Sequence, residues 1–318
     1  MKIRILIPII FTFIFSSCSD FSGNEDAVEA SLKPAPVTKT TTPPSTTTEY
    51  DLKAITFGNN TFVAVGESGV VRTSSDNGAT WDKGTPGKNI QLNEIAYGNS
   101  TFVAVGKSGA HLYSTDNGAT WDNGTWSDSD SVTGVAFGNN TFIGVSSTYL
   151  TKSTDNGANW VRACSGVRVY DMAFGNNKFV GSGAEGAIQI SDNGSGCSTP
   201  SGSGSGTTEE TLYGITFGNN RFLTVGSDGW LSITSDNGNN FTPLTIPTGA
   251  SHLFSSAYGN NIFVTVGNKS VVVSNNDGSS NPILKENTLS FNDVTFGNGV
   301  FVAVGNDEII YTSTDGDT

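Results

Sequence analysis

A motif of eight residues recurs along this chain and constrains its fold more than any other feature. It reads Ser-x-Asp-x-Gly-x-Thr-Trp at residues 74–81 and 114–121, and residues 153–160 repeat it with asparagine in place of threonine. Residues 234–241 give a softer copy that begins with threonine and ends with phenylalanine. We call this motif the octet. A second phrase, of the type Phe-Gly-Asn-Asn-x-Phe, alternates with it from residue 54 onward. Such alternation predicts one repeat domain rather than two separate domains.

The spacing of the second phrase gives the number of repeats. Its glycine recurs about every 40 residues, at Gly58, Gly98, Gly138, Gly175, Gly218, Gly259 and Gly297. Each repeat has the pattern of four short strands, and the second, such as Phe-Val-Ala-Val at 62–65, is apolar on both faces, which is typical of a strand buried on both sides. Seven such repeats predict an all-β fold, a seven-bladed β-propeller of four-stranded antiparallel blades over residues 49–318.

The octet resembles the Asp-box, or bacterial neuraminidase repeat, of sialidases, sortilin-type receptors, some glycoside hydrolases and photosystem II assembly-factor-like propellers. The resemblance implies a structural turn between the third and fourth strands of each blade. The residue types agree, because aspartate can accept backbone N–H bonds inside a turn, glycine tolerates positive φ, and an aromatic ring can pack between sheets. The residues expected to have this structural role are Asp76, Gly78, Trp81, Asp116, Gly118, Trp121, Asp155, Gly157, Trp160, Asp236, Gly238 and Phe241.

Three copies depart from the pattern, and the sixth, at residues 274–278, has no aromatic residue. The seventh ends at residues 313–318 without a fourth strand of its own, so we predict that part of 37–50 closes the last blade. In the fourth copy Cys197 stands at the tryptophan position. Cys164 and Cys197 either form one disulfide in an oxidising compartment or are two separate small hydrophobic residues.

The N-terminal segment predicts export. Residues 1–17 have a basic start and an apolar run too short to span a bilayer as a helix, as in a signal peptide. Ser-Ser-Cys at 16–18 resembles the lipobox of bacterial lipoproteins, which implies cleavage before Cys18, lipidation there and anchoring to the cell envelope, at the outer membrane or cell surface. The alternative is an ordinary secretory signal. Residues 18–48 are rich in threonine and proline and predict a disordered tether.

Composition and motifs exclude several classes of function. The net charge of −13 leaves no basic surface for nucleic acid. His111 and His252 are isolated, and no phosphate loop or EF-hand appears, so we predict neither a metal nor a cofactor. Sialidase activity requires an arginine cluster and a Phe/Tyr-Arg-Ile-Pro phrase. The phrase is absent, and only four arginines follow the signal peptide, so we expect no such activity.

Blade geometry indicates where a ligand site would lie. First-to-second and third-to-fourth turns share one face of the disc, which here carries the Gly-Asn turns and the octets. Second-to-third turns and blade connections share the other face, where the copies differ. The candidate ligand rim on that face is Glu67, Lys107, Tyr149, Glu185, Asp228, Trp230, Lys269 and Asp307. Each could equally be an ordinary loop residue, and Trp230 could pack between blades.

We therefore predict a non-catalytic, monomeric lipoprotein whose propeller binds a protein or glycan partner or assists assembly at the envelope. The alternative is a glycoside hydrolase or lyase that uses carboxylates on the variable face. Asp128 and Asp130, near Trp126, are candidates for that role, or simply a solvated acidic loop. An enzyme should gather carboxylates and aromatic residues in one central cleft, whereas a binding protein can spread them over a rim. A spacer without a specific ligand is a third possibility.

Overall fold

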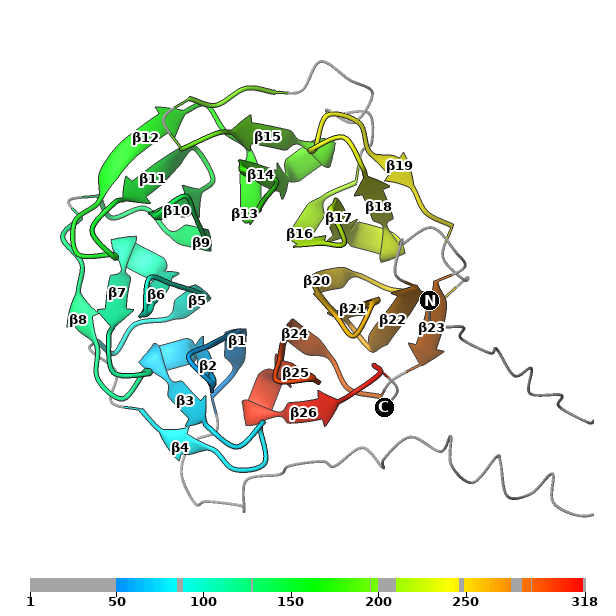
Figure 1. Ribbon diagram of the computed structural model, residues 1–318, viewed down its shortest axis with the longest axis horizontal. Coiled ribbons are helices and arrows are strands. Elements are labelled where there is room, and N and C mark those ends of the chain that lie inside the picture. The colour runs from blue at the N-terminus through cyan, green and yellow to red at the C-terminus, as the bar shows by residue number, and fades with distance from the viewer. Residues whose placement is uncertain are drawn as a thin grey trace, which may run out of the picture. The chain divides into compact units, whose positions relative to one another are not determined.

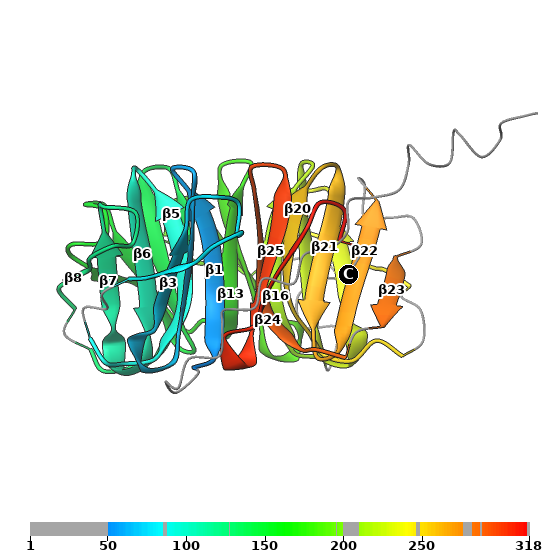
Figure 2. The ribbon, with the colours of Figure 1, turned by 90° about the horizontal axis from the view of Figure 1, so that it is seen from below.

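Seven small antiparallel sheets stand around a central axis as the blades of a β-propeller (Figures 1 and 2). The computed structural model describes residues 50–84, 88–126, 128–194, 196–199, 210–245, 249–275, 282–286 and 288–316. The predicted all-β, seven-bladed fold is confirmed. Among the described residues, no helix has the length and apolar character needed to cross a membrane.

Each blade runs outward from the axis in sequence order (Figure 1). Blade 1 comprises β1 (Leu52–Gly58), β2 (Thr61–Gly66), β3 (Val71–Ser74) and β4 (Asp82–Lys83); blade 2 comprises β5 (Leu92–Gly98), β6 (Thr101–Gly106), β7 (His111–Ser114) and β8 (Asp122–Asn123). Blade 3 comprises β9 (Val132–Gly138), β10 (Thr141–Ser146), β11 (Tyr149–Ser153) and β12 (Val161–Ser165); blade 4 comprises β13 (Val169–Gly175), β14 (Lys178–Gly183) and β15 (Ile188–Ser191). Blade 5 comprises β16 (Leu212–Gly218), β17 (Arg221–Gly226), β18 (Leu231–Thr234) and β19 (Thr242–Pro243); blade 6 comprises β20 (Leu253–Gly259), β21 (Ile262–Gly267), β22 (Ser270–Asn275) and β23 (Ile283–Glu286). Blade 7 comprises β24 (Phe291–Gly297), β25 (Val300–Gly305) and β26 (Ile310–Ser313).

Five blades also have a single 3-10 turn between their second and third strands. These turns are η1 (Glu67–Gly69), η2 (Lys107–Gly109), η3 (Ala184–Gly186), η4 (Ser227–Gly229) and η5 (Asn306–Glu308). In blade 4 the fourth-strand position is represented by one bridge, between Ile190 and Ser198. The predicted closing strand of blade 7 falls within 37–50, which lies outside the described residues except for Tyr50.

The Phe-Gly-Asn-Asn phrase forms a tight hairpin and an inter-blade contact. Asn59 and Asn60 have φ of 46° and 56°, the two positive values of a type I′ turn, which asparagine tolerates. A Cβ added at Gly58 would lie 2.1 Å from the ring of Tyr97 in the next blade. The same contact recurs at all seven repeats, and it closes the ring where Phe57 meets Gly297. Glycine is therefore required by the aromatic ring of the neighbouring blade.

The octet forms a closed hydrogen-bonded turn between the third and fourth strands. In blade 2 the Asp116 carboxylate accepts bonds from the Thr120 N–H (2.9 Å), the Thr120 hydroxyl (2.6 Å) and the Ser114 hydroxyl (2.8 Å). The Gly118 N–H donates to Ser114 Oγ at 2.9 Å, and the φ of Gly118 is 82°. The Trp121 indole N–H donates to the Gly118 carbonyl at 3.1 Å. Both carboxylate oxygens of this aspartate therefore accept hydrogen bonds within the turn.

The last residue of each octet packs against the preceding blade. Trp121 and Trp160 are 6% and 5% exposed and lie in the cores between blades 1 and 2 and between blades 2 and 3. Cys197 of blade 4 instead forms a disulfide with Cys164 of β12 in blade 3, with a Cα–Cα distance of 6.2 Å. Of the two alternatives that the sequence left open, the structure has the disulfide. A covalent bond thus joins blades 3 and 4 at the position where four other interfaces have the aromatic ring of an octet.

Blades 7 and 1 are joined by polar contacts as well as by apolar packing. Arg72 of β3 forms a bidentate ion pair with Glu308 of η5, with nitrogen–oxygen distances of 2.9 and 2.6 Å. The Ile55 N–H donates to Asp293 Oδ2 at 2.7 Å, and the Glu308 N–H donates to the Tyr50 carbonyl at 3.1 Å. These contacts join segments that lie more than two hundred residues apart in the sequence.

Candidate functional site

The face with the Gly-Asn turns and octets, here called the repeat face, uses its polar groups for inter-blade contacts. Asn59 of blade 1 donates to Asn117 of the octet in blade 2 at 2.8 Å. Equivalent bonds link Asn99 with Asn156, Asn176 with Asn237, and Asn298 with Asn77. Because these side chains hold neighbouring blades together, they are less available to a ligand.

The opposite face, here called the variable face, carries the second-to-third turns. In η1 the Glu67 N–H donates to the Asp51 carbonyl at 2.9 Å, so the turn lies beside the start of the first strand, and η2 to η4 have the equivalent bond. The central residue of each 3-10 turn has positive φ, for example 53° at Glu185. The two groups of turns therefore lie where blade geometry predicts.

Most residues of the predicted rim lie exposed on the variable face, but the structure does not bring them together. Lys107, Glu185, Asp228, Lys269 and Asp307 are exposed, and Glu67 and Trp230 are half-buried. Two of the carboxylates have local cationic partners: Glu185 pairs with Arg168 at 2.8 Å, and Glu67 lies 3.7 Å from Lys53. Trp230 packs against the core between blades 4 and 5.

Tyr149 is a correction to the predicted rim. It is 1% exposed, because blade 3 turns directly from β10 to β11 and directs this ring inward. The Tyr149 ring lies 6.0 Å from that of Trp126 and 4.0 Å beneath the Arg162 guanidinium. Arg162 also pairs with Asp128 at 2.7 Å. The acidic loop considered as a catalytic candidate is thus partly neutralised by an arginine.

His111 lies next to this cluster and is buried. Burial lowers the pKa of His111 to about 4, so the imidazole is neutral at physiological pH. Within the described ranges, no three His, Cys, Asp or Glu side chains are grouped so that they could hold a metal ion.

The central channel brings together polar residues that the sequence analysis missed. The first strands β1, β5, β9, β13, β16, β20 and β24 surround the axis (Figure 1). Each has a register shift around the residue five positions before the repeat glycine, as between Leu52 and Ala54 in β1. Such an irregularity re-aims side chains, so residues five and four positions before the glycine both line the channel. A comparison of the seven copies at these two positions would have identified them.

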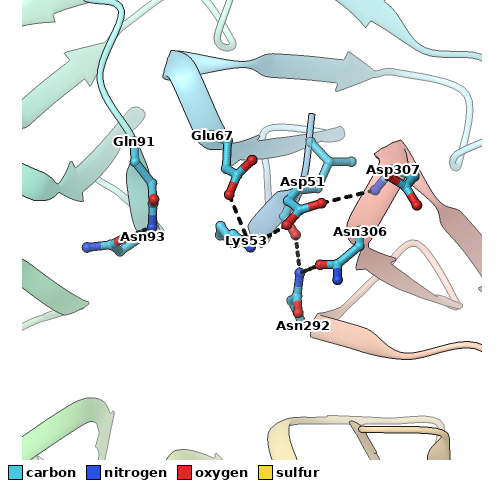
Figure 3. Close-up of polar contacts among 9 residues, drawn as sticks. Asp51, Lys53, Glu67, Gln91, Asn93, Asn292, Asn306 and Asp307 are labelled. Atoms are coloured by element: carbon cyan, nitrogen blue, oxygen red, sulfur yellow. Dashed lines mark hydrogen bonds and ion pairs between the residues drawn. The ribbon is translucent and has the colours of Figure 1, made fainter. Parts of the chain in front are cut away.

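Residues five positions before the glycine form the channel mouth on the variable face. They are Lys53, Asn93, Thr133, Tyr170, Tyr213, Phe254 and Asn292, and they border a hollow of about 190 Å³. The half formed by blades 4 to 6 is aromatic, and the half formed by blades 7 and 1 to 3 is polar. Figure 3 shows the polar half, where Asp51 accepts bonds from Lys53 at 2.8 Å and from the Asp307 N–H at 3.2 Å.

Residues four positions before the glycine place three carboxylates below the mouth. Glu94, Asp171 and Asp293 come from blades 2, 4 and 7 and line an inner hollow of about 270 Å³ that adjoins the mouth. Asp171 accepts bonds from the Met172 N–H in its own blade (2.7 Å) and the Ile215 N–H in the next (2.9 Å).

The other two carboxylates differ in how many donors they have. Asp293 accepts bonds from its neighbour Val294 (2.8 Å), from Ile55 and from Ser255. Glu94 accepts one bond, from the Ile95 N–H at 2.8 Å. Asp171 and Asp293 therefore link adjacent blades, whereas Glu94 is held by its own strand.

Burial in the channel keeps these carboxylates hard to ionise. It raises the pKa of Asp171 to about 7, although the Ile215 and Met172 N–H groups act in the opposite direction. Burial raises the pKa of Asp293 to about 6, against hydrogen bonds from Ser255 and two backbone N–H groups. The pKa of Glu94 is raised well above its ordinary value by burial and then by the charges of Asp293 and Asp171. The three groups therefore titrate as a coupled set.

Comparison with known proteins gives structural likeness alone. No protein-family model and no curated protein matches the sequence. Among solved structures, YCF48 from Cyanidioschyzon merolae is similar with a TM-score of 0.69 and 18% identity, covering 88% of this chain and 98% of that one. A structure of YCF48 bound to D1 peptide has the same TM-score and identity, covering 89% and 97%. The WD40 propeller domain of Doa1 has a TM-score of 0.68 and 16% identity, covering 87% and 96%. At such identities the likeness concerns the fold, and by that criterion the chain is a seven-bladed β-propeller.

Proposed function

We propose that this chain is a non-catalytic, exported lipoprotein whose propeller binds a protein partner at the channel mouth, in a binding or assembly role at the cell envelope. The observation that carries the proposal is the difference between the two faces. On the repeat face, asparagine side chains form hydrogen bonds between neighbouring blades. The seven mouth positions instead hold varied polar and aromatic residues around a hollow.

The residue types at the mouth suit a protein ligand. Half-buried aromatic side chains commonly anchor protein interfaces. Tyr213 and Phe254 lie with ring centroids 5.7 Å apart in edge-to-face geometry, and Tyr170 borders the same hollow. A structural neighbour, YCF48, has been solved with a peptide bound, which supports a peptide or protein ligand as the first class to test.

The test is affinity capture from envelope extracts with the full-length chain. Tyr213→Ala should abolish capture of a specific partner, because it removes an aromatic anchor from the mouth. Asp122→Ala, at an exposed position on the outer edge of blade 2, should leave capture unchanged and serves as the control. Equal capture by the two variants would place the binding surface elsewhere.

Export and lipidation have a separate test. The segment at 16–18 resembles a lipobox, so we expect lipid attachment at Cys18. Metabolic labelling with a radioactive fatty acid should mark the wild-type chain and not Cys18→Ser. A chain that is exported without the label would instead indicate an ordinary secretory signal.

A glycoside hydrolase is the second candidate, because the channel gathers carboxylates and aromatic residues in one place. We favour binding, since two of the three carboxylates accept hydrogen bonds from adjacent blades and so contribute to the fold. Release of reducing sugar from envelope glycans, lost in Glu94→Gln, would reverse this preference. A glycan array without product release would identify glycan binding instead.

A further inference from the structure

We infer that the channel receives an organic cation, a primary ammonium at the end of an aliphatic stem, with Glu94 as its principal counter-ion. The inference deepens the proposed function, since a lysine side chain of the partner is the expected source of the ammonium. A free amine is the other source of the same chemistry.

Charge is the first argument. The residues that line the inner hollow include Glu94, Asp171 and Asp293 and, within the described part of the chain, no lysine, arginine or histidine. Lys53 is the one cation at the mouth among the described residues, and it is engaged by Asp51 and Glu67 on the variable face (Figure 3). The carboxylates of the inner hollow therefore lack a counter-charge. An entering ammonium would supply it and would favour their ionised forms.

Unused hydrogen-bonding capacity is the second argument. Among the described residues, Glu94 accepts a single hydrogen bond, at Oε1 from the Ile95 N–H, so its carboxylate keeps acceptor capacity. An ammonium has three N–H donors and no acceptor, which matches this carboxylate.

The shape and lining of the mouth are the third argument. A cation on an aliphatic stem that enters from the variable face passes through the mouth, half of which is formed by Tyr170, Tyr213 and Phe254. Aromatic faces attract cations within about 6 Å and also pack against the methylene groups of a stem. The absence of a metal-holding group among the described residues argues for an organic rather than a metal ion.

Selective labelling provides a direct test. The chain has two methionines, Met1 and Met172, so [¹⁵N]methionine gives one internal amide signal. The Met172 N–H donates to Asp171 Oδ1 at 2.7 Å and therefore reports on the carboxylates of the inner hollow. We would titrate the full-length labelled chain with n-butylammonium chloride, with n-butanol as the neutral analogue, and with sodium chloride at equal ionic strength.

The expected result is a saturable shift of the Met172 amide with n-butylammonium alone. Glu94→Gln, which keeps an acceptor for Ile95, should weaken binding about tenfold or more, because it removes a charge-assisted hydrogen bond. Asp122→Asn, an exposed carboxylate on the outer edge of blade 2, should bind as the wild type does.

Three outcomes would overturn the inference: a shift no larger than that with sodium chloride, an equal shift with n-butanol, or equal affinity in Glu94→Gln. The signal of Met172 in each variant also shows whether the channel has folded. If n-butylammonium binds and no partner is captured, the proposed protein-binding function fails and the cation site stands. If a partner is captured and n-butylammonium neither binds nor competes with it, the cation site fails and the function stands. Competition by n-butylammonium that is lost in Glu94→Gln would identify the partner's side chain as the source.

Discussion

The ion pair between Arg72 and Glu308 makes a quantitative prediction about how the ring closes. It joins blade 1 to blade 7, and its side chains are 9% and 11% exposed. Glu308→Ala leaves the guanidinium buried without its carboxylate. Removal of one partner from a buried pair costs about 3–5 kcal/mol, mostly because the remaining charge is uncompensated. For a domain of this size that corresponds to a fall in melting temperature of roughly 10 °C.

The chain offers a matched control. Arg168 and Glu185 form the same kind of pair at 2.8 Å, but their side chains are 68% and 72% exposed. Glu185 and Glu308 both have φ of 53°, so alanine meets the same backbone strain at either position. Solvent screens the exposed pair, and Glu185→Ala should cost about 0–1 kcal/mol.

Urea denaturation followed by tryptophan fluorescence measures both free energies of unfolding. The double variant Arg72→Leu with Glu308→Leu should recover most of the loss, because an apolar pair removes the buried charge altogether. The reasoning would be refuted if Glu308→Ala and Glu185→Ala lowered stability equally. A loss in the double variant as large as in Glu308→Ala would show that hydrogen bonding, rather than uncompensated charge, sets the cost.

Three further predictions concern the inter-blade contacts and the channel. Gly98→Ala should prevent folding or lower the free energy of unfolding by several kcal/mol, since the added Cβ would lie 2.1 Å from the Phe137 ring. A Cβ added at Gly196 has nothing within 4 Å, so Gly196→Ala should leave the melting temperature unchanged. Reduction of the disulfide, which spans 33 residues, should lower stability by roughly 3–4 kcal/mol, and an unchanged melting curve in reductant would contradict this. Asp171 and Asp293 have pKa values raised to about 7 and about 6, so the stability they contribute is present below about pH 4 and is lost as pH rises through 6 to 7. Asp76, whose pKa is lowered by the Thr80 hydrogen bonds, contributes in the opposite sense and loses its effect as pH falls below about 4. The melting temperature should therefore pass through a maximum as pH rises. At pH values above that maximum, the melting temperature of Glu94→Gln should fall less than that of the wild type. A melting temperature that stays constant above about pH 5 would contradict the assignment of raised pKa values to the channel carboxylates.

The fold was predictable because each repeat contains the residues that form its turns and its contacts with the neighbouring blade. The Phe-Gly-Asn-Asn phrase encodes both a hairpin and the ring that packs on the neighbouring glycine, as Gly58 and Tyr97 show. The octet encodes a turn whose polar groups satisfy one another, as around Asp116. The glycine phrase recurs seven times, so the number of blades followed from its spacing, and the division into two faces followed from the order of strands in each blade.

The channel carboxylates could not be found by the same reasoning. Strict alternation along β5 would direct Asn93 and Glu94 to opposite sides of the sheet, whereas the register shift between Leu92 and Glu94 brings both into the channel. The glutamate comes from blade 2 and the aspartates from blades 4 and 7, so these residues line one hollow only because the ring of blades is closed. The rim prediction failed at Tyr149 for a related reason, because blade 3 lacks the 3-10 turn that its neighbours have.

Photo-crosslinking in living cells tests the central claim most directly. A photoreactive phenylalanine analogue would replace Tyr213 at the channel mouth or Thr115 on the exposed repeat face of the full-length chain. We expect a discrete crosslinked partner from position 213, suppressed by Glu94→Gln, and none from position 115. A discrete partner from position 115 with none from position 213 would contradict it.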